Sequence, residues 1–154
     1  MAIARGAGTE IIRTIHLQET DGEQTFIYGV QHHIYTVLSV VVRCVALQAT
    51  TNKFYITFVG WDAHTGASAV SSAILSQNIA VGETFVWNDK FSFNGHEPTG
   101  LSGALGAGNA AATILYQDAI ADQGSSTAQY IKAGVDDAAD DFDVLVTYID
   151  QNNS

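Results

Sequence analysis

The sequence has few of the residues that mark a disulfide-bonded scaffold or a nucleic-acid-binding protein. It contains one cysteine, Cys44, so no disulfide can form within the chain. Because Cys44 lies in an apolar run, we expect a buried, unreactive thiol. Six Lys and Arg side chains stand against 16 Asp and Glu, which gives a net charge of −10. Since phosphate backbones are bound by clustered basic residues, this balance argues against a nucleic-acid partner.

Catalytic and metal-binding motifs are equally scarce. Of the five histidines, His32 and His33 are adjacent and would point to opposite faces of a strand, and none has the spacing of a zinc site. No Gly-x-Ser-x-Gly step exposes a nucleophile. The acidic run Asp136–Asp143 could offer oxygen ligands to Ca²⁺, but a solvated turn is the favoured interpretation. We therefore expect no enzymatic activity, no cofactor and no metal.

No segment is long and apolar enough to predict a membrane span. The apolar run Val37–Leu47 carries Ser39 and Arg43 and is shorter than the roughly 20 residues that cross a bilayer. The first eight residues contain no long apolar stretch, so we expect a flexible arm of small residues over 1–8 rather than a signal peptide.

The sequence does have a strong alternation of apolar and polar residues with a period of two, from Thr9 to Asp150. This alternation is typical of half-buried antiparallel strands. We predict an all-β, single-domain antiparallel β-sandwich or jelly roll of about eight strands over 9–150, with a tail over 151–154.

The strand pattern also predicts how neighbouring segments pair. Thr9–Leu17 is expected at a sheet edge, and Ile34–Gln48 is apolar on both faces, as expected of a central strand. Its inward face is expected to comprise Leu38, Val40, Val42, Cys44 and Ala46. We expect Ile34–Gln48 and Lys53–Trp61 to form a long hairpin. A second hairpin is predicted around Asn88-Asp89.

A Gly- and Ala-rich insertion over 95–124 interrupts this pattern. Within it, 110–123 could form a short helix, while Thr113, Ile114 and Tyr116 favour a strand over 112–119 almost equally. The polar segment Asp62–Ala69 is predicted as a loop.

Several aromatic residues offer a different function. Trp61, Trp87, Tyr28, Tyr35 and Tyr55 could stack on sugar rings, as in a carbohydrate-binding sandwich. Aromatic residues at alternate strand positions are more often core or subunit contacts. The sequence is consistent with both a sugar-binding surface and core or subunit contacts.

The segment Gln77–Gly95, with its Gly-Glu-Thr-Phe step before an apolar strand, and the last strand Asp141–Asp150 resemble small virion structural proteins of tailed phages, in particular capsid decoration (cement) proteins. The resemblance implies a non-enzymatic β-sandwich that assembles, commonly as a trimer, on the outside of a phage head. Such a protein is made in the host cytoplasm, belongs to the virion and clamps neighbouring subunits of the major capsid protein.

We accordingly expect a homotrimer that uses one sheet face, because the two-sided apolar strand needs cover that one small sheet does not give. The arm over 1–8 is expected to reach a neighbouring subunit. The alternative is a receptor- or carbohydrate-binding module of a tail fibre or head fibre. The candidate assembly contacts are Ile3, Arg5, Ile11, Arg13, Tyr35, Trp61 and Trp87.

Overall fold

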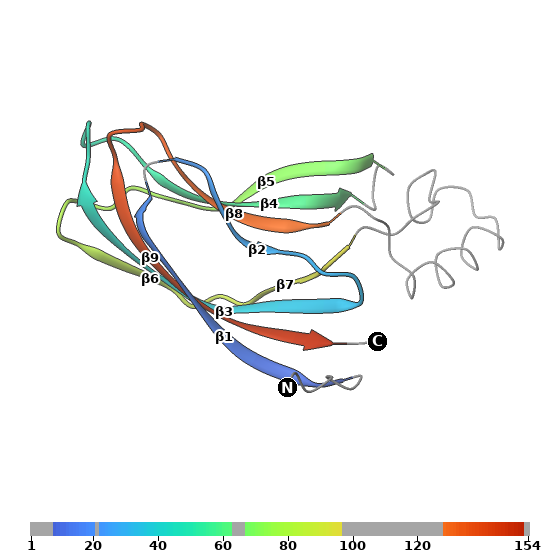
Figure 1. Ribbon diagram of the computed structural model, residues 1–154. Helices are drawn as coiled ribbons and strands as arrows, with labels where there is room; N and C mark the ends of the chain where they lie inside the picture. The colour runs from blue at the N-terminus through green and yellow to red at the C-terminus, as the bar shows by residue number, and fades with distance from the viewer. Residues whose placement is uncertain (1–7, 21, 63–66, 97–127, 153–154) are drawn as a thin grey trace.

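The computed structural model describes residues 8–20, 22–62, 67–96 and 128–152, and these ranges hold antiparallel strands and no helix (Figure 1). The all-β prediction is confirmed. The strands are β1 (Glu10–Thr20), β2 (Gln24–Tyr28), β3 (His33–Ala46), β4 (Phe54–Asp62), β5 (Ala67–Gln77), β6 (Thr84–Trp87), β7 (Phe91–Asn94), β8 (Tyr130–Val135) and β9 (Asp141–Asn152).

Two sheets face each other, and their strand order is that of a jelly roll. The sheet here called A has the order β1-β9-β3, with β6 and β7 along the far edge of β3, and sheet B has the order β2-β8-β4-β5. Figure 1 shows β1, β9 and β3 in the lower layer and β5, β4 and β8 in the upper layer. The predicted edge position of the first strand and central position of the third are thus both found.

The predicted hairpin between the third and fourth strands is wrong. β3 pairs with β9, β6 and β7, whereas β4 pairs with β5 and β8 in the opposite sheet. β3 and β4 each have a buried apolar face. Val42 lies on the buried face of β3 and Ile56 on that of β4. In separate sheets these faces cover each other across the core, and in one hairpin both would need a further cover.

The predicted hairpin around Asn88-Asp89 is also wrong. β6 pairs with Val40–Arg43 and β7 pairs with Ile34–Val37, so both lie along the same edge of β3. The segment Asn88–Lys90 interrupts one edge strand and does not reverse the chain. The described ranges hold nine strands, or eight when β6 and β7 are counted as one interrupted edge strand, against the prediction of about eight.

The inward face of β3 is not the single series that was predicted. Val37 lies opposite Tyr148 and Ser39 lies opposite Thr147, so the register shifts at Leu38. This bulge moves the buried positions from Tyr35 and Val37 to Val40, Val42 and Cys44. Leu38 is half-buried and stands at the shift itself.

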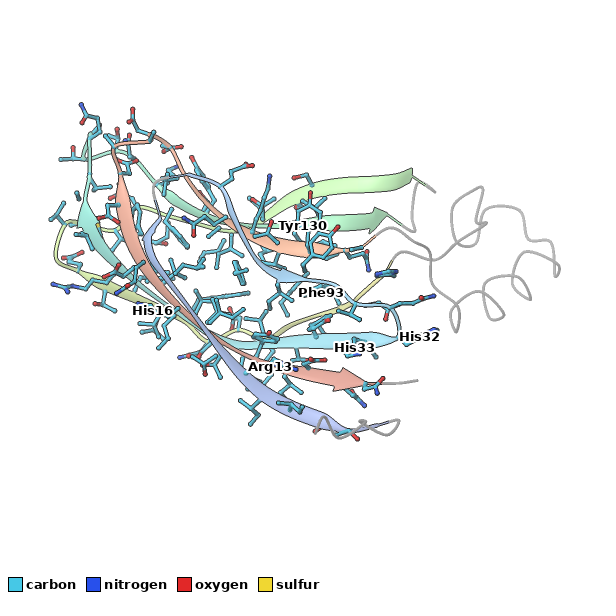
Figure 2. The ribbon with its side chains drawn as sticks, viewed as in Figure 1. Arg13, His16, His32, His33, Phe93 and Tyr130 are labelled. Atoms are coloured by element: carbon cyan, nitrogen blue, oxygen red, sulfur yellow. The ribbon has the colours of Figure 1, made fainter. Side chains whose placement is uncertain are left out.

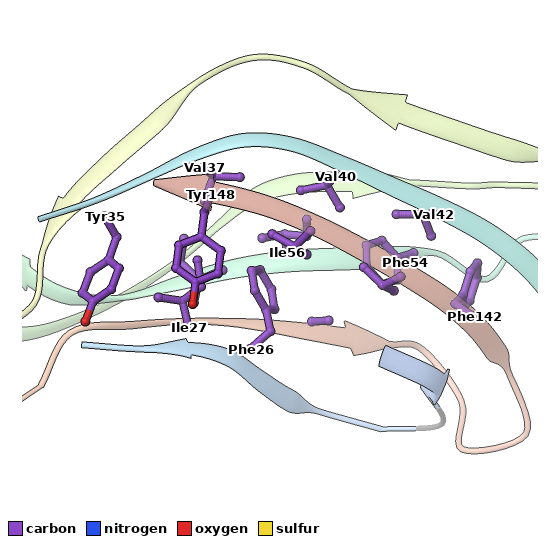
Figure 3. Packing of buried hydrophobic residues seen from close by; sticks show 14 of the residues in the cluster. Phe26, Ile27, Tyr35, Val37, Val40, Val42, Phe54, Ile56, Phe142 and Tyr148 are labelled. Atoms are coloured by element: carbon purple, nitrogen blue, oxygen red, sulfur yellow. The ribbon is translucent and has the colours of Figure 1, made fainter. Parts of the chain in front are cut away.

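The core is a layer of aliphatic and aromatic side chains between the two sheets (Figure 3). Phe54 of sheet B contacts Phe142 of sheet A with ring centroids 5.4 Å apart. Toward the other end, Phe58 packs against Phe91 and Phe93 at 5.3 and 5.4 Å. Cys44 is fully buried, as expected, and burial raises the pKa of its thiol. The thiol therefore stays protonated at neutral pH.

Some boundaries differ from the predictions. β5 begins at Ala67, inside the segment Asp62–Ala69 that was predicted as a loop. β9 continues through Asn152, whose amide donates to the carbonyl of Thr9 at 3.0 Å, so the first two residues of the predicted tail belong to the sheet. Gly8, the last residue of the predicted arm, donates its amide to the carbonyl of Asn152. Residues 1–7, and the predicted helix or strand within 110–123, lie outside the described residues.

Candidate functional site

The predicted contact residues fall in different parts of the molecule. Ile3 and Arg5 lie outside the described residues, as does the side chain of Trp61. Tyr35 is buried in the core. The remaining three are partly exposed: Ile11 and Arg13 on the edge strand β1, and Trp87 on β6, where it packs against the core. Of the four residues whose side chains are described, one is therefore in the core and three lie on two different strands, β1 and β6.

A buried carboxylate on β9 binds one of them, Arg13, together with His33. Asp150 on β9 accepts a hydrogen bond from Arg13 Nε at 3.0 Å, and its second oxygen lies 2.7 Å from His33 Nδ1. Figure 2 shows Arg13 and His33 near the same end of sheet A. Because these three residues come from β1, β9 and β3, the carboxylate ties three adjacent strands together. The carboxylate is buried whereas the Arg13 side chain is 47% exposed, so the pair lies at the border between the core and the solvent.

Tyr35 lies beside this carboxylate. Burial, and after it the negative charge of Asp150, raises the pKa of the Tyr35 hydroxyl to about 12. The hydroxyl accepts a hydrogen bond from the amide of Val30 at 3.1 Å. The folded protein therefore favours the neutral phenol more strongly than the unfolded chain does.

This difference predicts a loss of stability at alkaline pH. The folded-state pKa of Tyr35 is raised, so its contribution is fully present below pH 10 and is lost as the pH rises from 10 toward 12. We expect the urea midpoint of the wild type to fall more between pH 9 and 11.5 than that of Tyr35→Phe. Tyr55 and Tyr148, whose pKa values are also raised, titrate in both proteins, so the difference isolates Tyr35. Equal decline in the two proteins would contradict this assignment.

The acidic run between β8 and β9 has one buried aspartate, Asp140, while Asp136 and Asp137 are exposed. Asp140 is fully buried and accepts hydrogen bonds from Gln48 N at 2.7 Å and from Asn52 Nδ2 at 3.0 and 2.9 Å. Asp136 accepts from the amide of Lys53 at 2.8 Å and from the Tyr55 hydroxyl. These two carboxylates hold the turn between β3 and β4. The predicted solvated turn is thus wrong for Asp140, and the described residues include no group of three or more His, Cys, Asp or Glu side chains arranged for a metal ion.

His32 and His33 were expected in one strand, but only His33 belongs to a strand. His32 has φ of 64° and belongs to the turn before β3, whereas His33 opens that strand (Figure 2). His16 is exposed on β1.

The two ends of the insertion are clamped where they leave the sandwich. His96 forms an isolated antiparallel bridge with Ala128, and the amide of Gln129 donates to the carbonyl of Gly95 at 2.9 Å. A Cβ at Gly95 would collide with the backbone of Val30, so only glycine allows this close approach. Residues 97–127 between these anchors lie outside the described residues.

The outer face of sheet A carries a cross-strand row of side chains without Asp, Glu, Lys or Arg. One cross-strand row joins His16, Leu145, Val41 and Val86 from β1, β9, β3 and β6. Leu145 is 40% exposed and Val86 is 49% exposed. We call this row, together with Ile12 and Ile149, the sheet A outer face.

Charges on this face lie toward its ends. Glu10 stands at one end, and at the other Arg43 lies directly opposite Asp143, which places opposite charges side by side. In a chain of net charge −10, the middle of this face is thus free of like-charge repulsion. Sequence reasoning anticipated an uncovered face on the central strand but selected other residues for it.

A second exposed feature lies on sheet B. Tyr28 is 66% exposed and stacks on Tyr130 of the neighbouring strand, with ring centroids 5.7 Å apart and planes at 22°. Of the other residues weighed for sugar stacking, Tyr35 and Trp87 pack against the core, and the Tyr55 hydroxyl is bonded to Asp136.

Comparisons with known proteins name no family. No protein-family model and no curated protein matches the chain. Three solved chains match, among them one from a structure described as "Bacillus endospore appendages form a novel family of disulfide-linked pili". That alignment covers 100% of this chain and 97% of the other, with 12% identity and a TM-score of 0.39, values that assign no function. The described residues also contain no helix that could cross a membrane.

Proposed function

We propose that this chain is a non-enzymatic virion structural protein. It binds the outside of a phage capsid as a homotrimer and bridges neighbouring capsid subunits. The second-half resemblance to capsid decoration proteins suggests the class, and one structural observation carries the proposal: the sheet A outer face leaves apolar side chains of β1, β9 and β6 exposed, with the half-buried Val41 of β3 in the same row. Exposed apolar surface of this kind is typical of assembly contacts.

The position of this face in the sheet supports an assembly role. β3 and β9 are the inner strands of sheet A, and both are fully buried on their inward side. Covering the outward side with a neighbouring subunit removes Leu145, Val41 and Val86 from water, at a gain of roughly 25 cal/mol per Å² of apolar surface. In a trimer, each subunit can hold a different capsid neighbour, so weak contacts add through high effective concentration.

Leu145→Lys tests this proposal. The ammonium group would lie in the middle of an interface that excludes water, so we expect loss of the trimer by sedimentation and at least about a tenfold weakening of binding to purified heads. Heads without the protein should also break at lower temperature than decorated heads. The folded state should persist, because Leu145 points away from the core.

Val81→Lys is the matched control, since Val81 is an exposed apolar residue in the segment before β6. This variant should bind heads as the wild type does. A wild-type monomer that leaves heads unchanged, or a Leu145→Lys variant that decorates heads normally, would contradict the proposal.

The receptor-binding alternative rests on the exposed Tyr28–Tyr130 stack. An aromatic ring open to solvent on one side can stack on a sugar. Heads that stay robust without the protein, together with loss of host adsorption on Tyr28→Ala, would favour this second function.

A further inference from the structure

The free edge of β1 differs from the other three sheet edges. β2 has five residues and a register shift between Thr25 and Ile27. On β5, the pairing with β4 skips Ile74, so a bulge divides the strand. The edge made of β6 and β7 is interrupted over 88–90. Short, bulged and interrupted edges are the usual means by which sheets avoid pairing with other chains.

β1 shows none of these interruptions over its first eight residues. Glu10–Leu17 pairs residue by residue with Gln151–Val144 of β9, and no strand in the described ranges pairs with its other edge. This free edge also displays Ile12, which at 68% exposure is the most exposed large hydrophobic residue of the described chain. The one cation in the segment, Arg13, is already bonded to Asp150.

We propose that the free edge of β1 pairs antiparallel with β1 of a second copy of this chain, which joins two A sheets into one. An isologous contact of this kind relates the copies by a two-fold axis. It also makes the sheet A outer face continuous across the two copies. The proposal does not depend on capsid binding.

The side chains of β1 select the register of this pair. Residues directly opposite in an antiparallel pair lie on the same face, so odd residues oppose odd residues and even oppose even. Two registers overlap most of the regular segment: one centred on Arg13 and one on Thr14. The first sets two guanidinium groups directly opposite each other, which is destabilising.

The Thr14-centred register places no like charges opposite each other. It gives a Thr–Thr pair at the axis and pairs Ile11 with the partner's Leu17 on the inward side. In a single copy, both Ile11 and Leu17 are half-buried. In this register Thr14 lies opposite the partner's Thr14. Outward from this axis, Arg13 lies opposite the partner's Ile15, Ile12 opposite the partner's His16, Ile11 opposite the partner's Leu17 and Glu10 opposite the partner's Gln18.

Cysteine crosslinking tests both the pairing and its register. Thr14 is exposed and the native Cys44 is fully buried, so a Thr14→Cys variant of the full chain has a single accessible thiol among the described residues. Directly opposite residues reach disulfide geometry, whereas two Ile12 residues would be four positions out of register. Under mild oxidation, we expect Thr14→Cys to form covalent dimers at least about tenfold faster than Ile12→Cys.

Lysine variants provide a second measurement. Thr14→Lys sets two ammonium groups opposite each other at the axis, so it should abolish the β1-dependent association seen by sedimentation. Ser71→Lys is the matched control, because Ser71 is exposed on the edge strand β5 opposite neutral Val59. In a Leu145→Lys background, which removes the proposed face contact, the wild-type edge should still give dimers and Thr14→Lys should give monomers.

These outcomes separate this proposal from the proposed function. Dimers in the Leu145→Lys background together with rapid Thr14→Cys crosslinking support edge pairing even if heads are never bound. Three results would overturn the proposed pairing, whatever the protein does on a capsid. The first is a monomer in the Leu145→Lys background, and the second is Thr14→Cys crosslinking no faster than that of Ile12→Cys. The third is association of Thr14→Lys equal to that of Ser71→Lys.

Discussion

Val42→Asp is expected to unfold the protein or to lower its free energy of unfolding by about 4 kcal/mol or more. Val42 is fully buried on the central strand β3, directly opposite Val144 of β9 and Phe85 of β6. A carboxylate at this position would face only apolar neighbours, and no described cation lies in the core cluster to pair with it. Urea unfolding followed by circular dichroism measures the loss.

Val45→Asp is the matched control for this experiment. Val45 lies on the same strand but is 42% exposed, so its carboxylate would remain hydrated. We expect a change within about 1 kcal/mol. If the two substitutions cost the same, Val42 would not be a core position, and the placement of the bulge at Leu38 would be wrong.

The class of fold could be predicted from the sequence because a period of two depends on each strand alone. A strand that is polar on one side, such as β7, and a strand that is apolar on both, such as β3, show their positions directly in the order of residues. Sheet pairing is different. The hairpin expected between β3 and β4 failed because alternation identifies an inward face but does not say which sheet supplies it.

The bulge at Leu38 could not be predicted for a related reason. Val37, Leu38, Val40, Val41 and Val42 are all apolar, so either alternation satisfies the pattern on both sides of the shift. Where both faces of a strand are hydrophobic, the sequence does not determine which alternate residues point into the core.

The polar cluster around Asp150 did leave a signal. Arg13 interrupts the apolar series of β1, and Asp150 continues the inward series of β9 after Val146 and Tyr148. A charge on an otherwise buried face requires a partner, and two such residues of opposite sign on different strands suggest each other. His33 carried no comparable signal, because a histidine at a strand end is equally common as a surface residue.

The acidic run 136–143 contains a second buried carboxylate, that of Asp140, which the sequence did not predict. Five aspartates close together favour a solvated turn, and no local feature separates Asp140 from the exposed Asp137. The distinction arises only when the turn between β3 and β4 is brought beside it, with the backbone of Gln48 and the amide of Asn52 as donors. These contacts join residues about 90 positions apart, so the spacing of residues near Asp140 could not predict them.

Asp140→Ala is expected to lower the free energy of unfolding by roughly 2–4 kcal/mol. Its two oxygens accept from Gln48 N, Asn52 Nδ2 and Asp137 N, the last at 3.1 Å, and all of these donors lose their acceptor at once. Because the carboxylate itself is fully buried, its removal leaves these part-buried donors facing an apolar methyl group, and a donor that loses its acceptor costs more than the bond itself contributes. Chemical denaturation at neutral pH measures the loss.

Asp137→Ala separates this effect from the change in charge. It removes the same negative charge from the same turn, but Asp137 is exposed and its side chain accepts a hydrogen bond from Ala139 N at 2.9 Å. We expect a change within about 1 kcal/mol, and relief of repulsion among the neighbouring aspartates could offset it. Asp140→Asn keeps the shape but turns an NH₂ group toward other donors, so its loss should fall between the two. If Asp140→Ala and Asp137→Ala were equally mild, the buried carboxylate would not hold the two turns together, and the stability of this end of the sandwich would come from the Phe54–Phe142 contact and its apolar neighbours.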